Sequence, residues 1–500
     1  MKLTDLFFLM FSIIALIQDA KAINRNIPSL VANKNALIEA QYQKSIQLLF
    51  HNLSPYDGLK GAIVASPSNV NPNYYFNWVR DAALTAESLI AVYNATTSRN
   101  TYLRSSIKSF LLDFINFNIQ IQKDSLLHAG LGEPRFLVNG RTDTLPWGRP
   151  QNDGPALRSA VNIEILSLAS KENWPEFEPL LKKLYDPNTN NVSLVKSDLE
   201  YVAHYWMNPT IDLWEEFYGY HFYTLMTQRK SLYYGAALAK VLKDTESSNF
   251  YLNELKKAEN RLQSFWNPNI NYILASFYAN QSPFIESSAK RKSRVVNKSQ
   301  LDIAVLLGVL HAEVNQLSFS VSDPRVFSSY LTLKRMFSQI YSINNESSLN
   351  TAFGRYPEDT YDGYSPNSRG NPWILTTAAA AEYNYRLALD YLNNQKILIN
   401  FANVNYFSSV VKFQLIEGQT INVSQPEFKL IINSLINEGD LYMLRILYHA
   451  NPDGSLSEQY NRENGYMQGA PHLTWSYAAY ITAKIKRDQV IARVSNRKNL

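Results

Sequence analysis

Apolar residues recur at intervals of three and four along most of the chain, which is the spacing of helices that bury one face. Between residues 81 and 93, for example, Leu89 and Val92 are three positions apart. The pattern predicts about a dozen helices. They cover residues 34–53, 81–93, 102–122, 154–169, 172–185, 194–206, 218–242, 250–265, 299–314, 324–341, 371–392, 427–449 and 473–490. Strand-like alternation is limited to residues 270–276 and 408–423, so the predicted fold class is all-α.

These helices account for most of the chain beyond residue 22 without a second module. We therefore expect one domain over residues 23–490 and a disordered tail over residues 491–500. No Ser/Thr/Pro-rich linker and no β-rich terminal segment follows the helices, so no appended binding domain is expected.

The first 22 residues have the pattern of a cleaved secretory signal peptide. Lys2 precedes an apolar run from residue 6 to residue 17, and Ala20-Lys-Ala22 ends the segment. The run is shorter than the roughly 20 residues that cross a membrane, so we expect a protein of the secretory pathway, secreted or vacuolar, that is not held in a membrane. Asn-x-Ser/Thr sequons fit this route. Glycans are expected at several of Asn52, Asn94, Asn191, Asn297, Asn345 and Asn422, and Pro283 makes Asn280 a poorer acceptor.

Composition excludes several classes of protein. Hydrophobic residues make up 46% of the 500 positions and charged residues 18%, which excludes disorder driven by charge. The absence of cysteine excludes disulfides, Cys-ligated zinc and thiol nucleophiles. The seven histidines contain no His-Glu-x-x-His spacing, so we expect no metal and no cofactor. The net charge of +5 is spread along the chain, which argues against nucleic-acid binding.

The chemistry is expected in loops that feed directly into helices. Five stretches combine aromatic and polar residues with Gly or Pro: residues 66–81, 130–158, 208–222, 354–373 and 453–475. Loops carry function when a scaffold fixes their ends. We therefore predict one pocket rimmed by these loops. The 32 Tyr, 24 Phe and 8 Trp suit stacking on sugar rings, although most of them must fill the core.

Carboxylates stand out in two of these loops. Asp212, Glu215 and Glu216 surround Trp214, so burial and like charge should raise the pKa of at least one of them and make it a general acid. Alternatively, Glu215 and Glu216 stabilise the N-terminus of a helix that begins at residue 218. Glu458 is a second, distant carboxylate. Glycoside hydrolysis needs two, spaced roughly 6.5–9.5 Å apart in an inverting enzyme, but by itself Glu458 also suits a surface loop.

Arg80 and Asp81 stand where a predicted helix begins. Together they offer donors and acceptors for vicinal hydroxyls of a sugar, or alternatively a helix cap with a structural ion pair. Residues 147–154 and 354–361 repeat the combination of an aromatic residue, an arginine and an acid among turn-forming residues.

These motifs resemble those of the glucoamylases, the glucan 1,4-α-glucosidases of glycoside hydrolase family 15 from fungi and yeasts. The resemblance runs from about residue 34 to residue 490. It is carried by residues 64–68, 71–72, 78–81, 130–134, 147–158, 198–201, 212–216, 354–361, 370–373, 457–460 and 473–477. It implies an (α/α)6 toroid that releases β-D-glucose, with inversion, from the non-reducing ends of starch, glycogen or maltooligosaccharides, and acts more slowly on α-1,6 bonds.

The resemblance also implies roles for individual residues. Glu215 would be the general acid and Glu458 the general base, with Asp212 assisting. Arg80 and Asp81 would bind the terminal glucose, and Tyr74 would help orient Glu458. The full set of expected sugar-binding residues is Tyr74, Trp78, Arg80, Asp81, Trp147, Leu213, Trp214, Glu216, Arg355, Trp373 and Trp475. Leu213 and Trp214 would act through their backbone. A monomer with an α-glucan substrate is expected.

Some features depart from the family pattern. Gly469 stands where many relatives from filamentous fungi have a serine, and residues 141–146 replace the usual approach to Trp147. No starch-binding domain is visible, so granular starch should be a poor substrate. The alternatives are a related hydrolase of trehalose or isomaltose, an inactive glucan-binding homologue, and a purely structural helical protein.

Overall fold

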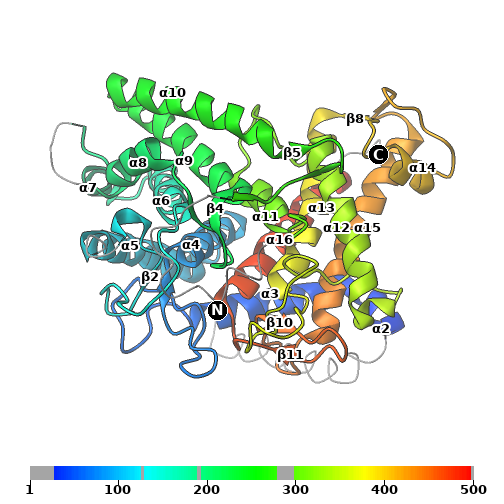
Figure 1. Cartoon of the computed structure of the whole chain (residues 1–500), viewed down its shortest axis with the longest axis horizontal. Helices are drawn as coiled ribbons and strands as arrows, with labels where there is room; N and C mark the ends of the chain where they lie inside the picture. Colours follow the sequence, from blue (N-terminus) through cyan, green and yellow to red (C-terminus); the bar gives the residue numbers. More distant parts are fainter. Residues whose placement is uncertain (1–26, 125–128, 188–192, 279–297, 497–500) are drawn as a thin grey trace. The chain divides into compact units, whose positions relative to one another are not determined.

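The computed structural model describes residues 27–124, 129–187, 193–278 and 298–496 (Figure 1). The predicted signal peptide and the sequons at Asn191, Asn280 and Asn297 lie outside these ranges. Helices dominate the described residues and strands are two to four residues long, which confirms the all-α prediction. The described residues form two compact units, residues 52–65 with 74–329 (unit 2) and the remainder (unit 1).

Unit 2 consists of stacked helices with short strands in the connecting loops. Its helices are α4 (Val79–Ala95), α5 (Thr101–Asp124), η2 (Gly130–Gly132), α6 (Asp153–Lys171), α7 (Phe177–Leu184), α8 (Leu194–Tyr205), α9 (Phe222–Val241), α10 (Thr245–Leu262), η3 (Gln263–Phe265) and α11 (Ala304–Ala312). Its strands are β1 (Asn77–Trp78), β2 (Arg135–Phe136), β3 (Thr210–Ile211), β4 (Tyr218–His221), β5 (Trp266–Asn267), β6 (Tyr272–Ile273) and β7 (Ser276–Tyr278).

Helix α9 is the centre of unit 2. It packs against α6, α8, α10 and α11, and all its residues from 222 to 232 are buried. A helix that is buried on every side must pair its charges. Arg229 accordingly lies 3.0 Å from Glu259, and Lys230 lies 3.0 Å from both Glu87 and Glu164. Unit 2 ends at Ser329, within α12 (Pro324–Ile340), and the remainder of this helix belongs to unit 1.

Unit 1 is built in the same way around α13. Its other helices are α2 (Ile27–Ala32), α3 (Lys34–Phe50), η4 (Ser342–Asn345), α13 (Ile374–Asn394), α14 (Val404–Val411), α15 (Pro426–His449) and α16 (Thr474–Ser495). Its strands are β8 (Lys396–Leu398), β9 (Thr420–Asn422), β10 (Gln459–Tyr460) and β11 (Met467–Gln468). Residues 374–385 of α13 are all buried, and this helix packs against α15 and α16.

Most predicted helices are present, and their ends differ by a few residues. A difference in the type of element occurs at residues 218–221, which form a strand and not the first turn of a helix. Strand β4 pairs with β3 and β7, with Gly219 opposite both Thr210 and Tyr278. A Cβ at Gly219 would lie 2.2 Å from the carbonyl oxygen of Phe277, so the glycine permits this close pairing. Local aromatic content and tertiary pairing override the helical period here.

Two further predictions were wrong. Residues 404–411 form helix α14, so the predicted strand over 408–423 is reduced to residues 420–422. Helix α16 continues to Ser495, so residues 491–495 are helical and do not belong to a disordered tail. Val411 is buried within α14, and the last buried residue of α16 is Val490.

The sequons within the described residues differ in exposure. Asn94, Asn345 and Asn422 are exposed. Asn52 is only 1% exposed, which argues against a glycan at this sequon. No helix among the described residues is long and apolar enough to cross a membrane. Across the same residues there is no group of three or more His, Asp or Glu side chains that could hold a metal ion.

Candidate active site

Glu215 of unit 2 sits in a tight turn between β3 and β4. The carboxylate of Asp212 builds this turn: its Oδ1 accepts the backbone N–H groups of Glu216 at 2.8 Å and Phe217 at 2.7 Å. Glu215 itself has φ +62, a left-handed conformation that costs a non-glycine residue of order 1–3 kcal/mol. The turn therefore fixes the direction of the Glu215 side chain at the expense of backbone strain.

Three nitrogen groups face the Glu215 carboxylate. Its Oε1 accepts the indole N–H of Trp78 at 2.8 Å and the carboxamide of Gln151 at 2.8 Å. A guanidinium nitrogen of Arg80 lies 3.7 Å from the same oxygen. Although these groups surround it, the Glu215 side chain keeps 18% of its surface exposed, so it is held firmly and remains accessible.

Arg80 organises a buried charge cluster beside Glu215. Its guanidinium donates to Asp153 at 2.8 Å and to Gln151 at 3.0 Å, and lies 3.7 Å from Asp81. Burial raises the pKa of Asp81 to about 7; Arg80 opposes this rise, and the charges of Glu215 and Asp153 add to it. The Arg80–Asp81 ion pair predicted as one alternative is thus present, in contact with the carboxylate predicted to be catalytic.

Aromatic rings form a wall next to this cluster. The Trp78 ring lies 5.6 Å from that of Tyr74 and 6.0 Å from that of Trp147, both edge to face. The guanidinium of Arg135, paired with Asp143, lies 3.7 Å from the centroid of the Trp147 ring. The Trp147 indole N–H is buried and has no hydrogen-bond partner within the described part of the chain.

The 212–217 turn is also held by a contact between Trp214 and Asp302. Leu213 and Trp214 are buried. The Trp214 indole donates to both carboxylate oxygens of Asp302, at 3.0 and 3.1 Å. Burial raises the pKa of Asp302 to about 7. Glu216 points elsewhere and lies 3.2 Å from the Lys298 ammonium.

Glu458 of unit 1 is held in a different way, by its own backbone. Its N–H donates to the carbonyl of Ala470 at 2.9 Å, and its carbonyl accepts from Ile374 at 3.2 Å. It directly precedes β10, which pairs with β11. Glu458 is 1% exposed, and its Oε2 accepts the Gln459 carboxamide at 3.2 Å. The expectation that it is an ordinary surface loop residue was wrong.

Gly469 makes room for the Glu458 carboxylate. Its φ of +74 is left-handed, and a Cβ at this position would lie 2.5 Å from Glu458 Oε2. Any side chain here would therefore strain the backbone and displace the carboxylate.

The remaining predicted residues of unit 1 are Arg355, Trp373 and Trp475. Arg355 is 3% exposed and forms a bidentate pair with Asp359, at 2.8 and 2.6 Å. Its guanidinium lies 5.3 Å from the centroid of the Trp373 ring. Trp373 caps α13, and Trp475 lies in the first turn of α16; both are buried.

Within unit 2, the structure brings together Trp78, Arg80, Asp81 and Glu215, with Tyr74 and Trp147 adjacent through Trp78. The alternative in which Glu215 and Glu216 stabilise a helix N-terminus was wrong, because α9 begins at Phe222 and has no acidic residue in its first turn. In unit 1, Trp373 connects the two groups of predicted residues, since it contacts Arg355 and bridges to Gln459 next to Glu458.

Sequence reasoning missed several residues that hold the candidate catalytic groups. Gln151 and Asp153 lie in the 147–154 motif, which was singled out without assigning them a role. Asp302 has no motif of its own, and only its contact with Trp214 reveals it. The signal that could have found Gln151 was its position between Arg149 and Asp153 in that loop.

The chain is similar to known proteins over most of its length. The model of the family described as glycosyl hydrolases family 15 matches residues 10–484. The chain is 34% identical over 452 residues to a glucoamylase of Blastobotrys adeninivorans, covering 88% of this chain and 69% of that protein. It is 32% identical to glucoamylase GLU1 of Saccharomycopsis fibuligera, covering 97% and 99%.

The solved structure of a glucoamylase from Saccharomycopsis fibuligera matches with a TM-score of 0.81 at 31% identity, over 92% of this chain and 96% of that one. This likeness confirms the expected (α/α)6 fold. The match of the family model over nearly the whole chain, together with these relatives, shows that the protein belongs to glycosyl hydrolases family 15, the family of the glucoamylases, and is a glycoside hydrolase.

Proposed function

We propose that the protein is an inverting, exo-acting glucan 1,4-α-glucosidase that releases β-D-glucose from non-reducing ends of starch, glycogen or maltooligosaccharides, and cleaves α-1,6 bonds more slowly. Family membership supports a hydrolase of glucans. The finer assignment rests on the surroundings of Glu215 and Glu458.

Glu215 would act as the general acid. The N–H donors of Trp78 and Gln151 both aim at its Oε1, so a proton to be delivered would reside on Oε2. Transfer of that proton to the glycosidic oxygen lets the C1–O bond break, and the leaving sugar departs as an alcohol. Asp212 assists by holding the turn that orients Glu215.

Glu458 would act as the general base. It would take a proton from a water molecule that attacks C1 from the opposite face, so the configuration at C1 inverts. This role requires the two carboxylates to stand about 6.5–9.5 Å apart, with room for a water molecule. The close fit between Glu458 and Gly469 supports a carboxylate with a fixed direction.

The sugar would be held by charged and aromatic side chains. Arg80 and Asp81 would bind hydroxyls of the terminal glucose, and Trp147 would stack on the next sugar. Tyr74, Trp78, Glu216, Arg355, Trp373, Trp475 and the backbone of Leu213 and Trp214 would complete the site. A closed end formed by Arg80 and Asp81 would limit cleavage to chain ends.

The observation that carries the proposal is the combination at Glu215 of left-handed backbone, two N–H donors on one oxygen and partial exposure. Strain of this kind persists where the surrounding structure imposes it, and it clusters at active sites. A carboxylate needed only for stability would gain nothing from the strained turn.

The test is the anomer of the first product. Purified protein is mixed with maltoheptaose, and the sugar released is followed by proton NMR before mutarotation. We expect β-glucose and a maltohexaose co-product. Release of α-glucose would refute the inverting mechanism, and release of internal fragments would refute exo action. A panel with trehalose and isomaltose distinguishes the related hydrolases, and maltose binding without turnover would identify an inactive homologue.

The signal-like N-terminus and the exposed sequons support passage through the secretory pathway. We propose glycans at Asn94, Asn345 and Asn422, all of which are exposed. We expect no glycan at Asn52, because it is buried. Peptide mass analysis before and after deglycosylation of protein made in a yeast host tests this assignment. Modification at Asn52 would contradict the fold.

A further inference from the structure

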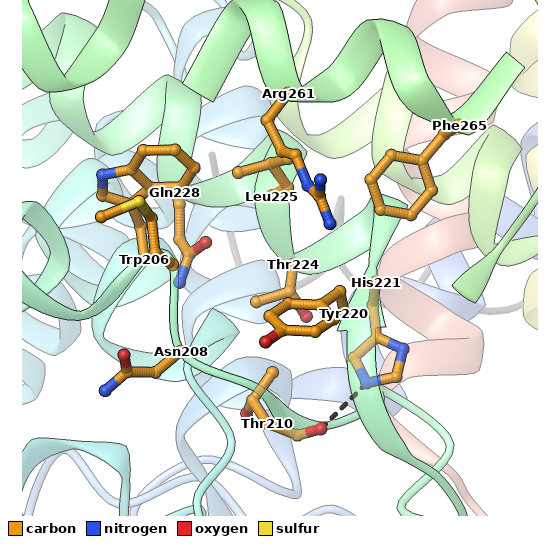
Figure 2. Close-up of a pocket in the computed structure, with 11 residues that line it drawn as sticks. Trp206, Asn208, Thr210, Tyr220, His221, Thr224, Leu225, Gln228, Arg261 and Phe265 are labelled. Carbon is orange, nitrogen blue, oxygen red and sulfur yellow. Dashed lines mark hydrogen bonds between the residues drawn. The ribbon is translucent and has the colours of Figure 1, made fainter. Parts of the chain in front are cut away.

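One cavity in unit 2 has no role in the mechanism above. Its volume is about 220 Å³. It lies among β3, β4, the first turns of α9, the end of α8 and the end of α10 (Figure 2). The lining residues are Trp206, Met207, Asn208, Thr210, Tyr220, His221, Thr224, Leu225, Gln228, Arg261 and Phe265. None of them belongs to the set expected to bind substrate at Glu215.

A buried amide faces this cavity. Gln228 is only 2% exposed and lines the cavity, and the hydroxyl oxygen of Thr224, also in its wall, is buried and has no hydrogen-bond partner in the described part of the chain. A buried polar group without a partner is destabilising. Gln228 is drawn between Trp206 and Thr224, with Asn208 below (Figure 2). An occupant with both donors and acceptors would pair with the Thr224 hydroxyl and the Gln228 carboxamide.

The other lining groups restrict the chemistry of the occupant. None of the lining residues is acidic, and the one formal charge is the exposed guanidinium of Arg261, 5.6 Å from the Tyr220 ring centroid. His221 is neutral in character, because burial lowers its pKa. The aromatic residues Trp206, Tyr220 and Phe265 provide apolar surface. The set combines apolar faces with neutral donors and acceptors.

We propose that this cavity is a binding site for a single hexose ring, either free glucose or the end of a glucan chain. A pyranose presents apolar C–H faces to aromatic side chains and hydroxyls that both donate and accept. The cavity is smaller than the roughly 300–1,000 Å³ of sites for drug-sized ligands, so one sugar unit fits its size and a longer chain does not.

The site adjoins the segment that carries Glu215. Thr210, in the wall of the cavity, accepts the Asn152 N–H through its hydroxyl at 2.9 Å and donates to the Pro150 carbonyl at 2.8 Å. The residue between these two is Gln151, which donates to Glu215. A sugar bound here would therefore lie next to Thr210, which contacts the loop of residues 150–152 that holds the proposed acid.

The test is a soak of crystals of the full chain with D-glucose, a product that is not turned over. We expect density for a pyranose ring in contact with Gln228, with an affinity in the millimolar range. Gln228→Leu and Arg261→Ala should each reduce its affinity up to about tenfold, measured as site occupancy across a glucose series. Arg335→Ala removes an exposed arginine of unit 1 and is the matched control.

Each outcome decides the proposal. A ring that is present in the native protein and the control, and weakened in both variants, supports it. A cavity that holds only water at high glucose concentration overturns it, as does a cavity that takes inorganic phosphate but no sugar, which would make Arg261 an anion site. Both cavity variants should retain normal turnover of maltose, so failure here is distinguishable from failure of the proposed hydrolysis.

Discussion

The two carboxylates assigned to catalysis are held by contrasting means. Glu215 is partly exposed, and side chains from two other loops, Trp78 and Gln151, determine its orientation. Glu458 is buried and is positioned by backbone hydrogen bonds to Ala470 and Ile374. Its carboxylate occupies the place that a side chain at Gly469 would take. The surroundings of Glu215 include the charged guanidinium of Arg80, whereas those of Glu458 include backbone groups, the Gln459 carboxamide and the closely approaching Gly469.

This contrast suits the two roles. A proton donor must keep access to the substrate while neighbouring dipoles fix its unused oxygen, and a base must aim one oxygen at a water molecule with little freedom. The comparison therefore predicts different vulnerabilities. Removing a hydrogen-bond donor should lower activity through Glu215, and adding a side chain at Gly469 should lower activity through Glu458.

The largest effect should separate the two roles directly. Glu215→Gln and Glu458→Gln should each lower kcat on maltose by roughly 10²–10⁴. With α-D-glucosyl fluoride, whose leaving group departs without protonation, Glu215→Gln should recover most of the native rate and Glu458→Gln should not. Steady-state fluoride release measures both. Equal recovery by the two variants would contradict the assignment of acid and base.

A methyl group at Gly469 should cost about 10² in kcat, because it would push the Glu458 carboxylate away from its position. The matched control is Gly418→Ala in the same unit. Gly418 has φ +88 and open space around its missing Cβ, so it shares the backbone strain without the contact. Kinetics on maltose, with urea unfolding for stability, distinguish the two. If both variants lost activity equally, strain and not displacement would be the cause.

Trp78→Phe removes one N–H donor from Glu215 and should lower kcat/KM about tenfold, because that hydrogen bond stabilises the negative charge that develops on Glu215 as its proton leaves. Trp174→Phe is the control, because Trp174 is a buried tryptophan of unit 2 that packs against Tyr93 instead. Both variants lose similar ring area. A tenfold loss confined to Trp78→Phe is expected, and matching losses would point to packing.

The smallest effect concerns the support behind the Glu215 turn and depends on pH. Folding raises the pKa of Asp302 from 3.8 to about 7. The folded chain then binds a proton that the unfolded chain releases, so stability falls as pH rises from about 4 to about 7. Between pH 6 and pH 7, the titration of Asp302 should lower the free energy of unfolding of the native protein by about 1 kcal/mol. Asp302→Asn removes this contribution, so the free energy of unfolding of the variant should fall by that much less. Urea unfolding at the two pH values measures it. Identical losses in both proteins would exclude a raised pKa.

Much of the fold followed from the sequence alone. The period of apolar residues predicts α5, α8, α12 and α15 to within a few residues, since each is long and buries one continuous face. It failed at residues 218–221, where pairing with β3 and β7 decides the conformation, and at α14, whose two turns are too few for a clear period. The motifs gave the candidate site residues, which stay predictions, but not Gln151 or Asp302, which contact residues distant in the sequence.

By itself, the sequence determined the helical class, the loops that carry chemistry and the two candidate carboxylates, because apolar period and motif are local properties of the chain. Only the tertiary structure decided that Glu215 adopts a left-handed backbone under two N–H donors, that Glu458 is buried, and that Gly469 provides its space. Those features depend on which segments meet in space. The hydrogen bonds to Glu215 come from Gln151, 64 positions away, and from Trp78, 137 positions away, so no local sequence pattern predicts them.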